Sequence, residues 1–214
     1  QNSTLVTVTP ELEITNCTNL DITNTNYSLI QDANSGGTCF YVLANNITLD
    51  CHGYEVNYSQ SVVGYGVNIT SYNYSTIKSC KIVQADLDTD NSNAYGVYIF
   101  KNASNNTVFN NTITPIGSEG DGVLINSTAY YNYVYSNNIK TTSGEGVQIT
   151  TAYNNYVYSN NITISNGGTG VFLQTTAYSN KVYDNNITIS GADGYGVYLV
   201  TTAYNNSVYS NTIT

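Results

Sequence analysis

The chain lacks arginine, methionine and tryptophan, and only 9% of its 214 residues are charged. Its basic residues are five lysines, against 14 acidic residues, which gives a net charge of −9. Proteins that bind nucleic acid neutralise phosphates with clustered Lys or Arg, so this composition argues against nucleic acid as a partner. The low charge and the 41% hydrophobic content also exclude a disordered chain.

Long hydrophobic runs are also missing, so the sequence predicts no membrane span. The chain opens at Gln1 without a signal sequence, and we interpret it as a mature secreted, extracellular protein. Fourteen N-x-S/T sequons favour attached N-glycans, although an Asn-rich repeat also creates sequons incidentally. The sequons begin at Asn2, Asn16, Asn26, Asn46, Asn57, Asn68, Asn73, Asn102, Asn105, Asn110, Asn126, Asn161, Asn186 and Asn205.

What the chain has in abundance is Asn and Tyr, with 33 and 22 residues, and both recur in repeats. Near copies of one segment read AYYNYVYSNNI (129–139), AYNNYVYSNNI (152–162), AYSNKVYDNNI (177–187) and AYNNSVYSNTI (203–213). A second element, Gly-x-Gly-Val-x-Ile or close to it, recurs from GYGVNI (64–69) to GYGVYL (194–199). Apolar residues alternate within both, which is strand periodicity. The sequence therefore predicts an all-β, parallel β-solenoid of about seven to eight coils with about 25 residues each.

Stacked coils place equivalent side chains in columns about 4.8 Å apart. We predict an amide ladder at the corner, which also suits Asn because Asn tolerates left-handed backbone; its members are Asn111, Asn137, Asn160, Asn185 and Asn211. An aromatic ladder is predicted at Phe109, Tyr135, Tyr158, Tyr183 and Tyr209, and a second column at Tyr130, Tyr153, Tyr178 and Tyr204. Such outward tyrosines either stack on sugars or simply protect the coil surface.

The pattern G-x-G-V-x-I followed by N-x-V-x-x-N-x-I resembles right-handed parallel β-helix proteins of the pectin-lyase-like and NosD-type carbohydrate-binding groups. The stretch TCFYVLANNITLDCHGYEV (38–56) resembles the opening coil of secreted, cell-surface members. The resemblance covers residues 36–214 and leaves 1–35 as an N-terminal strand or capping segment. It implies a fold that hosts lyases, hydrolases, adhesins and inert fibres alike.

Four cysteines in a secreted chain suggest two disulfides, with three connectivities open. Cys17 and Cys39 are 22 residues apart and Cys51 and Cys80 are 29 apart, each close to one coil, whereas the other pairings are 12, 34, 41 or 63 apart. We predict Cys17–Cys39 and Cys51–Cys80, with free buried thiols as the alternative.

The sequence contains few residues in patterns typical of catalysis. By the resemblance, lyases of this fold use an Arg or Lys base beside calcium-binding carboxylates, and hydrolases use three clustered Asp. This chain has no Arg and no such cluster, and His52 is interpreted as a turn residue without an acidic or nucleophilic partner, so no catalytic residues are predicted.

One acidic feature remains. Asp86, Asp88 and Asp90 alternate in an expanded loop like the start of a calcium loop, with Glu119, Asp121 and Glu145 stacked on neighbouring coils. The alternative is an acidic loop that is simply solvated. Calcium is the only cofactor that the sequence suggests.

For function, the alternating apolar residues of 4–15 and the last coil ending at Thr214 suggest head-to-tail addition of subunits, unless the sequence is a fragment. The leading hypothesis is a non-enzymatic, structural protein that polymerises with itself into a cell-surface filament or matrix. The alternatives are a polysaccharide-binding or polysaccharide-cleaving β-helix protein, or an adhesin module.

Overall fold

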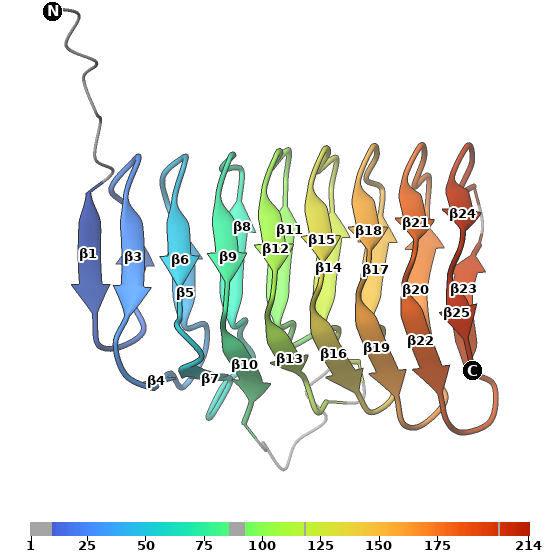
Figure 1. Ribbon diagram of the computed structural model, residues 1–214, viewed down its shortest axis with the longest axis horizontal. Coiled ribbons are helices and arrows are strands. Elements are labelled where there is room, and N and C mark those ends of the chain that lie inside the picture. The colour runs from blue at the N-terminus through green and yellow to red at the C-terminus, as the bar shows by residue number, and fades with distance from the viewer. Residues whose placement is uncertain (1–9, 86–92, 118, 201) are drawn as a thin grey trace, which may run out of the picture.

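The computed structural model describes residues 10–85, 93–117, 119–200 and 202–214, in which every regular element is a β-strand. Successive coils stack in a row along one axis, so that residues far apart in sequence lie side by side (Figure 1). All strand pairs are parallel and form three sheets, which confirms the predicted right-handed parallel β-helix.

A full coil contributes one strand to each sheet, in the order A, C, B. Sheet A contains β1 (Glu11–Ile14), β3 (Asn26–Leu29), β6 (Thr48–Asp50), β9 (Thr76–Lys78), β12 (Thr107–Phe109), β15 (Tyr133–Tyr135), β18 (Tyr156–Tyr158), β21 (Lys181–Tyr183) and β24 (Ser207–Tyr209). Sheet B contains β2 (Asn19–Leu20), β5 (Phe40–Val42), β8 (Val67–Thr70), β11 (Val97–Phe100), β14 (Val123–Asn126), β17 (Val147–Thr150), β20 (Thr169–Gln174) and β23 (Tyr195–Leu199). Sheet C contains β4 (Ala33–Asn34), β7 (Glu55–Tyr58), β10 (Lys81–Gln84), β13 (Thr112–Thr114), β16 (Asn138–Thr141), β19 (Asn161–Ile164), β22 (Asn186–Ile189) and β25 (Thr212–Ile213).

Inward residues of each strand stack on their equivalents to form the core. In sheet A, Val108, Val134, Val157 and Val182 are paired in register and fully buried. The alternating strand pattern puts the neighbouring residues on the outer face. The solenoid therefore has a fixed aliphatic interior and an outer surface whose columns are free to vary.

The first coils belong to the same sheets as the repeats. Strand β1 pairs with β3, β2 with β5, and β4 with β7, so residues 10–35 continue the solenoid rather than form a separate segment. The structure thus shows no break at the predicted boundary after residue 35. Sequence similarity fades there because these coils contain neither the Gly-x-Gly element nor the Asn-x-Val-x-x-Asn segment of the later repeats.

The predicted Asn ladder is present and buried. Each side chain donates from Nδ2 to the Oδ1 of the next, for example Asn137 to Asn160 at 3.0 Å. A second ladder, which was not predicted, follows the same rule at Asn106, Asn132, Asn155, Asn180 and Asn206. The expectation that ladder Asn residues are left-handed is wrong, because the residue before each one takes the positive φ, such as Ser159 at 54° before Asn160.

Candidate functional site

The residue between the two glycines of each Gly-x-Gly element points outward from the start of a sheet B strand. Backbone N–H groups of the second glycine join successive coils here. The Gly96 N–H donates to the carbonyl oxygen of Asp121, and the Gly122 N–H donates to that of Glu145. The resulting column, from the N-terminal to the C-terminal coils, reads Tyr65, Tyr95, Asp121, Glu145, Thr169 and Tyr195. A pair of carboxyl groups therefore lies between tyrosines along the axis.

Glycine is required beside this column because the coils approach closely. A Cβ atom on Gly122 would lie 2.5 Å from the carbonyl oxygen of Gly146, and one on Gly146 would lie 2.6 Å from that of Gly170. Real Cβ atoms do not come this near to backbone oxygen, so any side chain would push the coils apart. The glycines thus fix the separation of Asp121 and Glu145 at one coil spacing, about 4.8 Å along the axis.

Asp121 is 1% exposed, and its two carboxyl oxygens differ. Oδ1 accepts a hydrogen bond from the Glu145 backbone N–H at 3.0 Å, whereas Oδ2 is buried without a hydrogen-bond partner among the described residues. Burial, and then the neighbouring Glu145 carboxyl, raise the pKa of Asp121 well above its usual value. The protonated acid is the favoured state because an unpartnered buried carboxylate is costly.

A cavity of about 270 Å³ opens at this pair. It is lined by Asn93, Tyr95, Glu119, Asp121, Glu145 and Gln148. The Tyr95 hydroxyl donates to Asn93 Oδ1 at 2.8 Å, and burial followed by the Asp121 charge raises the pKa of Tyr95. Tyr95 therefore stays a neutral hydrogen-bonding partner at physiological pH.

Aromatic rings adjoin this cavity on the N-terminal side. The Tyr65 and Tyr95 rings are parallel with centroids 5.6 Å apart, while Tyr98 is tilted by 43° and 47° against them. Burial, and then Tyr65, raise the pKa of Tyr98 to about 12. On the C-terminal side, Tyr195 and Tyr198 lie with centroids 4.4 Å apart. Along the axis the carboxyl pair therefore follows Tyr95 directly, whereas Thr169 separates Glu145 from Tyr195.

The predicted aromatic ladders of sheet A are also present, but their ring faces are occupied. Neighbouring rings in both columns have centroids 4.9 to 5.2 Å apart and planes within 10° of parallel. Stacking on a sugar requires a free ring face, and within the ladders each face is covered by the next ring. Of the two interpretations of these tyrosines, the structure favours protection of the coil surface.

The predicted calcium residues Asp86, Asp88 and Asp90 lie outside the described residues. Within the described part of the chain, no group of three or more His, Cys, Asp or Glu side chains is arranged to hold a metal ion. Of the residues expected to add ligands, Asp121 and Glu145 are stacked on adjacent coils as predicted. Calcium binding stays a prediction. The described residues also include no helix that could cross a membrane.

The sequon asparagines lie apart from the ladder asparagines. Asn2 lies outside the described residues, and none of the other 13 is buried. The ladders instead use buried residues such as Asn111 and Asn160. The exposed sequons can therefore carry glycans without disturbing the corner ladders. Their occupancy stays a prediction.

Both predicted disulfides form. Cys17 bonds to Cys39, and Cys51 bonds to Cys80, with Cα atoms 4.6 and 4.7 Å apart. Leu49 pairs with Ile77, the register that brings Cys51 diagonally beside Cys80 on the next coil. Each disulfide thus joins adjacent coils near the N-terminal end of the solenoid.

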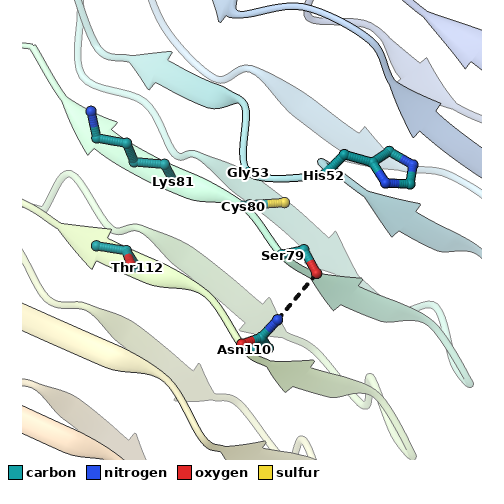
Figure 2. Close-up of a pocket in the computed structure, with 7 residues that line it drawn as sticks. All are labelled: His52, Gly53, Ser79, Cys80, Lys81, Asn110 and Thr112. Atoms are coloured by element: carbon teal, nitrogen blue, oxygen red, sulfur yellow. Dashed lines mark hydrogen bonds between the residues drawn. The ribbon is translucent and has the colours of Figure 1, made fainter.

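The interpretation of His52 as a residue without partners is wrong. It lines an open groove of about 610 Å³ together with Gly53, Ser79, Cys80, Lys81, Asn110 and Thr112 (Figure 2). On its other side, His52 Nε2 lies 2.7 Å from Ser28 Oγ, and Nδ1 lies 3.7 Å from Asp50 Oδ1. Sequence analysis missed Ser28 because the two residues are 24 positions apart and meet only through the coil register.

The whole length of the chain matches one family. Residues 2–213 match the sequence profile of the family described as "Right handed beta helix region". The chain belongs to this family. No curated protein matches this right-handed β-helix chain by sequence.

Solved structures resemble this right-handed β-helix in fold. One is the tailspike protein of E. coli bacteriophage HK620 in complex with a pentasaccharide, with 12% identity and a TM-score of 0.68 over 90% of this chain and 39% of that chain. Another is the periplasmic alginate epimerase AlgG, with 12% identity and a TM-score of 0.56 over 89% of this chain and 51% of that one. The chain spans about half or less of each, and at such identity the likeness shows the fold alone.

Proposed function

We propose that this β-helix binds an extended polysaccharide along the outer face of sheet B. The observation that carries the proposal is the column in which Asp121 and Glu145 interrupt a run of tyrosines beside an open cavity. From Tyr95 to Tyr195 the column spans four coil spacings, about 19 Å, which suits several sugar rings in a row. Aromatic groups contact the apolar faces of such rings, and carboxyl and amide groups bind the hydroxyls. The tailspike neighbour, whose complex holds a pentasaccharide, supports a ligand of this class.

The charge of the cavity indicates which polysaccharide fits. Three of its lining residues, Glu119, Asp121 and Glu145, are acidic, and the described lining includes no lysine. An acidic polymer would be repelled by the Glu119 and Glu145 carboxylates and by the net charge of −9. We therefore propose a neutral or amino-sugar polymer, in contrast to the alginate named for the epimerase neighbour.

Affinity electrophoresis in gels that contain neutral, basic or acidic polysaccharides tests this proposal. We expect retardation by a neutral or basic polymer and none by alginate. Tyr98→Ala should weaken binding roughly tenfold by removing one aromatic contact. The matched control is Tyr158→Ala, a half-buried tyrosine of the sheet A ladder, which should bind like the unmodified chain. Equal loss in both variants, or no retardation by any polymer, would refute a sheet B binding face.

Cleavage of the bound polymer is a second candidate function, which the carboxyl pair favours. Glycoside hydrolysis uses one protonated and one ionised carboxyl group, and burial raises the pKa of Asp121 well above its usual value, the direction that a general acid needs. Glu145 is the half-exposed member of the pair and the one that a substrate reaches. Release of reducing ends that is lost in Glu145→Gln, while gel retardation persists, would establish cleavage. Retardation without release would leave the protein a polysaccharide binder without cleavage activity, which is one of the alternatives to the structural filament predicted from the sequence.

Secretion is consistent with the two disulfides, which persist in oxidising compartments. The adhesin alternative needs the same sheet B face, because adhesion to a glycan is polysaccharide binding by an anchored protein. The head-to-tail filament has no support from the comparisons and stays a prediction. Electron microscopy that shows only monomers would exclude it.

A further inference from the structure

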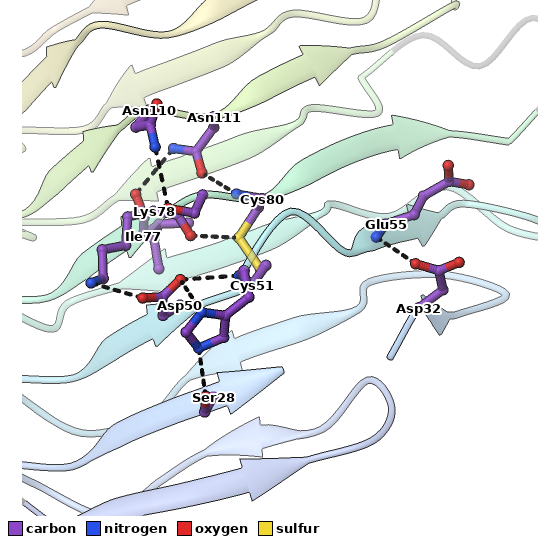
Figure 3. The surroundings of a disulfide bond; sticks show 12 residues. Ser28, Asp32, Asp50, Cys51, Glu55, Ile77, Lys78, Cys80, Asn110 and Asn111 are labelled. Carbon is purple, nitrogen blue, oxygen red and sulfur yellow. Dashed lines mark hydrogen bonds and ion pairs between the residues drawn. A yellow bond between two sulfur atoms is a disulfide. The ribbon is translucent and has the colours of Figure 1, made fainter. Parts of the chain in front are cut away.

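A second polar cluster lies on the outer face of sheet A, on the three coils before its aromatic ladder begins. The strand register stacks Ser28 on Asp50 and Asp50 on Lys78, at the position that Phe109 occupies one coil later. His52 follows Asp50 by two residues and turns back over Ser28. Serine, histidine and a carboxylate thus meet on adjacent coils (Figure 3).

The backbone holds His52 in an unusual conformation for this contact. Its φ is 48°, in the left-handed region that non-glycine residues rarely adopt, and its N–H donates to Asp50 Oδ1 at 3.0 Å. Cys51, between the two residues, is bonded to Cys80 on the next coil. The disulfide and the turn together aim the imidazole at Ser28.

The hydrogen bonds assign a role to each ring nitrogen. With Nε2 accepting from the Ser28 hydroxyl, the proton of the neutral imidazole sits on Nδ1, the nitrogen nearer Asp50 Oδ1. Asp50 Oδ2 accepts from Lys78 Nζ at 2.8 Å. Although burial acts to raise it, the pKa of Asp50 is lowered by hydrogen bonds from Lys78 and from the His52 backbone and by both their charges. Asp50 is therefore ionised at neutral pH.

A cavity of about 190 Å³ lies at Ser28. Its lining includes Asn26, Thr48, Asp50, His52 and Lys78. Ser28 itself is only 6% exposed, so a reacting group must enter this cavity and must be small. The His52 side chain is 49% exposed and also lines the open groove of about 610 Å³, which gives water and a larger substrate body access to the ring.

We propose that Ser28 and His52, with Asp50 as a positioning residue, hydrolyse carboxylic esters that carry a small acyl group. Ser28 Oγ attacks the ester carbonyl while its proton passes to His52 Nε2, and the tetrahedral intermediate expels the alcohol, which takes that proton. Water then attacks the acyl-serine, His52 accepts its proton, and collapse releases the carboxylic acid and restores Ser28. The side-chain amide of Asn26, the hydroxyl of Thr48 and the ammonium of Lys78 are donor groups on the cavity wall for the oxyanion.

This activity is separate from the polysaccharide site, because Ser28 and His52 belong to sheet A and its following turn and the carboxyl pair belongs to sheet B. Neither proposal requires the other. An ester-substituted polysaccharide is the substrate for which both sites would be used together.

The full chain is assayed with p-nitrophenyl acetate and labelled with a fluorophosphonate that reacts with activated serine. We expect acetate hydrolysis, little hydrolysis of p-nitrophenyl octanoate, and a label that peptide mapping assigns to Ser28. Ser28→Ala and His52→Asn should lower kcat by about 100-fold or more. Asn is chosen because it tolerates the left-handed backbone at position 52. Asp50→Asn should lower kcat with KM changed less than twofold, which a general loss of structure would not produce.

Thr76→Val is the matched control, since Thr76 pairs with Thr48 one coil on and is not part of the lining of this cavity. It should retain the activity and the label. Circular dichroism of each variant establishes that the solenoid is intact. An intact protein that neither hydrolyses acetate nor takes the label, or Ser28→Ala protein as active as the unmodified chain, would overturn the proposal.

Discussion

Removal of one ladder amide should destabilise the solenoid far more than removal of the Asn beside it. Asn160 is buried in the ladder and Asn161 is exposed at the start of β19. Asn160 Nδ2 donates to the carbonyl oxygen of Val134 at 2.9 Å and to Asn185 Oδ1 at 3.0 Å. Its Oδ1 accepts from the backbone and side-chain nitrogens of Asn137, both at 3.0 Å. Asn160→Ala therefore removes four buried hydrogen bonds at once.

The magnitude follows from that number. At about 1 kcal/mol for each net hydrogen bond, the loss in the free energy of unfolding is about 4 kcal/mol. The Asn137 backbone N–H is then left buried and unpaired, which adds to the cost. For a chain of this size, a loss of about 4 kcal/mol corresponds to a fall of roughly 8 to 16 °C in the melting temperature.

Urea unfolding of unglycosylated protein, followed by far-UV circular dichroism, measures both variants. Asn161→Ala removes only exposed amide contacts to the side chains of Asn138 and Asn186 and should cost less than about 0.5 kcal/mol. Because stacked repeats can unfold in parts, tyrosine fluorescence serves as a second probe of the same transition. A loss of 1 kcal/mol or less for Asn160→Ala, or equal losses for the two variants, would refute the ladder as a source of stability.

Two further predictions concern the disulfide and the buried acid. Replacing both Cys51 and Cys80 by Ala should lower the free energy of unfolding by about 3 to 4 kcal/mol, because their separation of 29 residues restricts the unfolded chain; no change in the urea midpoint would contradict this. The raised pKa of Asp121 means that the folded state binds its proton more tightly than the unfolded state, so this group's contribution to stability is lost as pH rises above about 4. Asp121→Asn should accordingly gain stability over the unmodified chain between pH 4 and 7, with the difference vanishing below pH 4; a difference that does not depend on pH would show that Asp121 is not protonated in the fold.

The fold could be predicted because its determinants repeat. Val134, Val157 and Val182 recur at nearly one interval and occupy one core column, so the spacing alone gives the register. The second Asn ladder escaped prediction although its residues repeat just as regularly. The pattern Asn-x-Val-x-x-Asn carries two inward amides, and only the structure shows that both are buried.

The candidate sites were harder to predict from the sequence because they depend on departures from the repeat. Asp121 and Glu145 were expected to stack, since they occupy equivalent positions in the Gly-x-Gly element. The burial of Asp121, with one carboxyl oxygen unpaired, depends on side-chain packing. The spacing of residues along the sequence does not show it. Ser28 lies in the first coils, where the repeat is irregular, so no periodicity placed it beside His52.

Both candidate sites lie where a column that is aromatic in other coils carries polar residues instead. On sheet B, Asp121 and Glu145 follow Tyr65 and Tyr95, and on sheet A the polar column ends at Lys78 where the rings begin. Like aromatic rings one coil apart attract one another, whereas carboxyl groups at the same spacing repel unless one is protonated. A solenoid selected only for stability would continue the rings through Asp121 and Glu145. Their presence in this column at a cost in stability is what a functional site would explain.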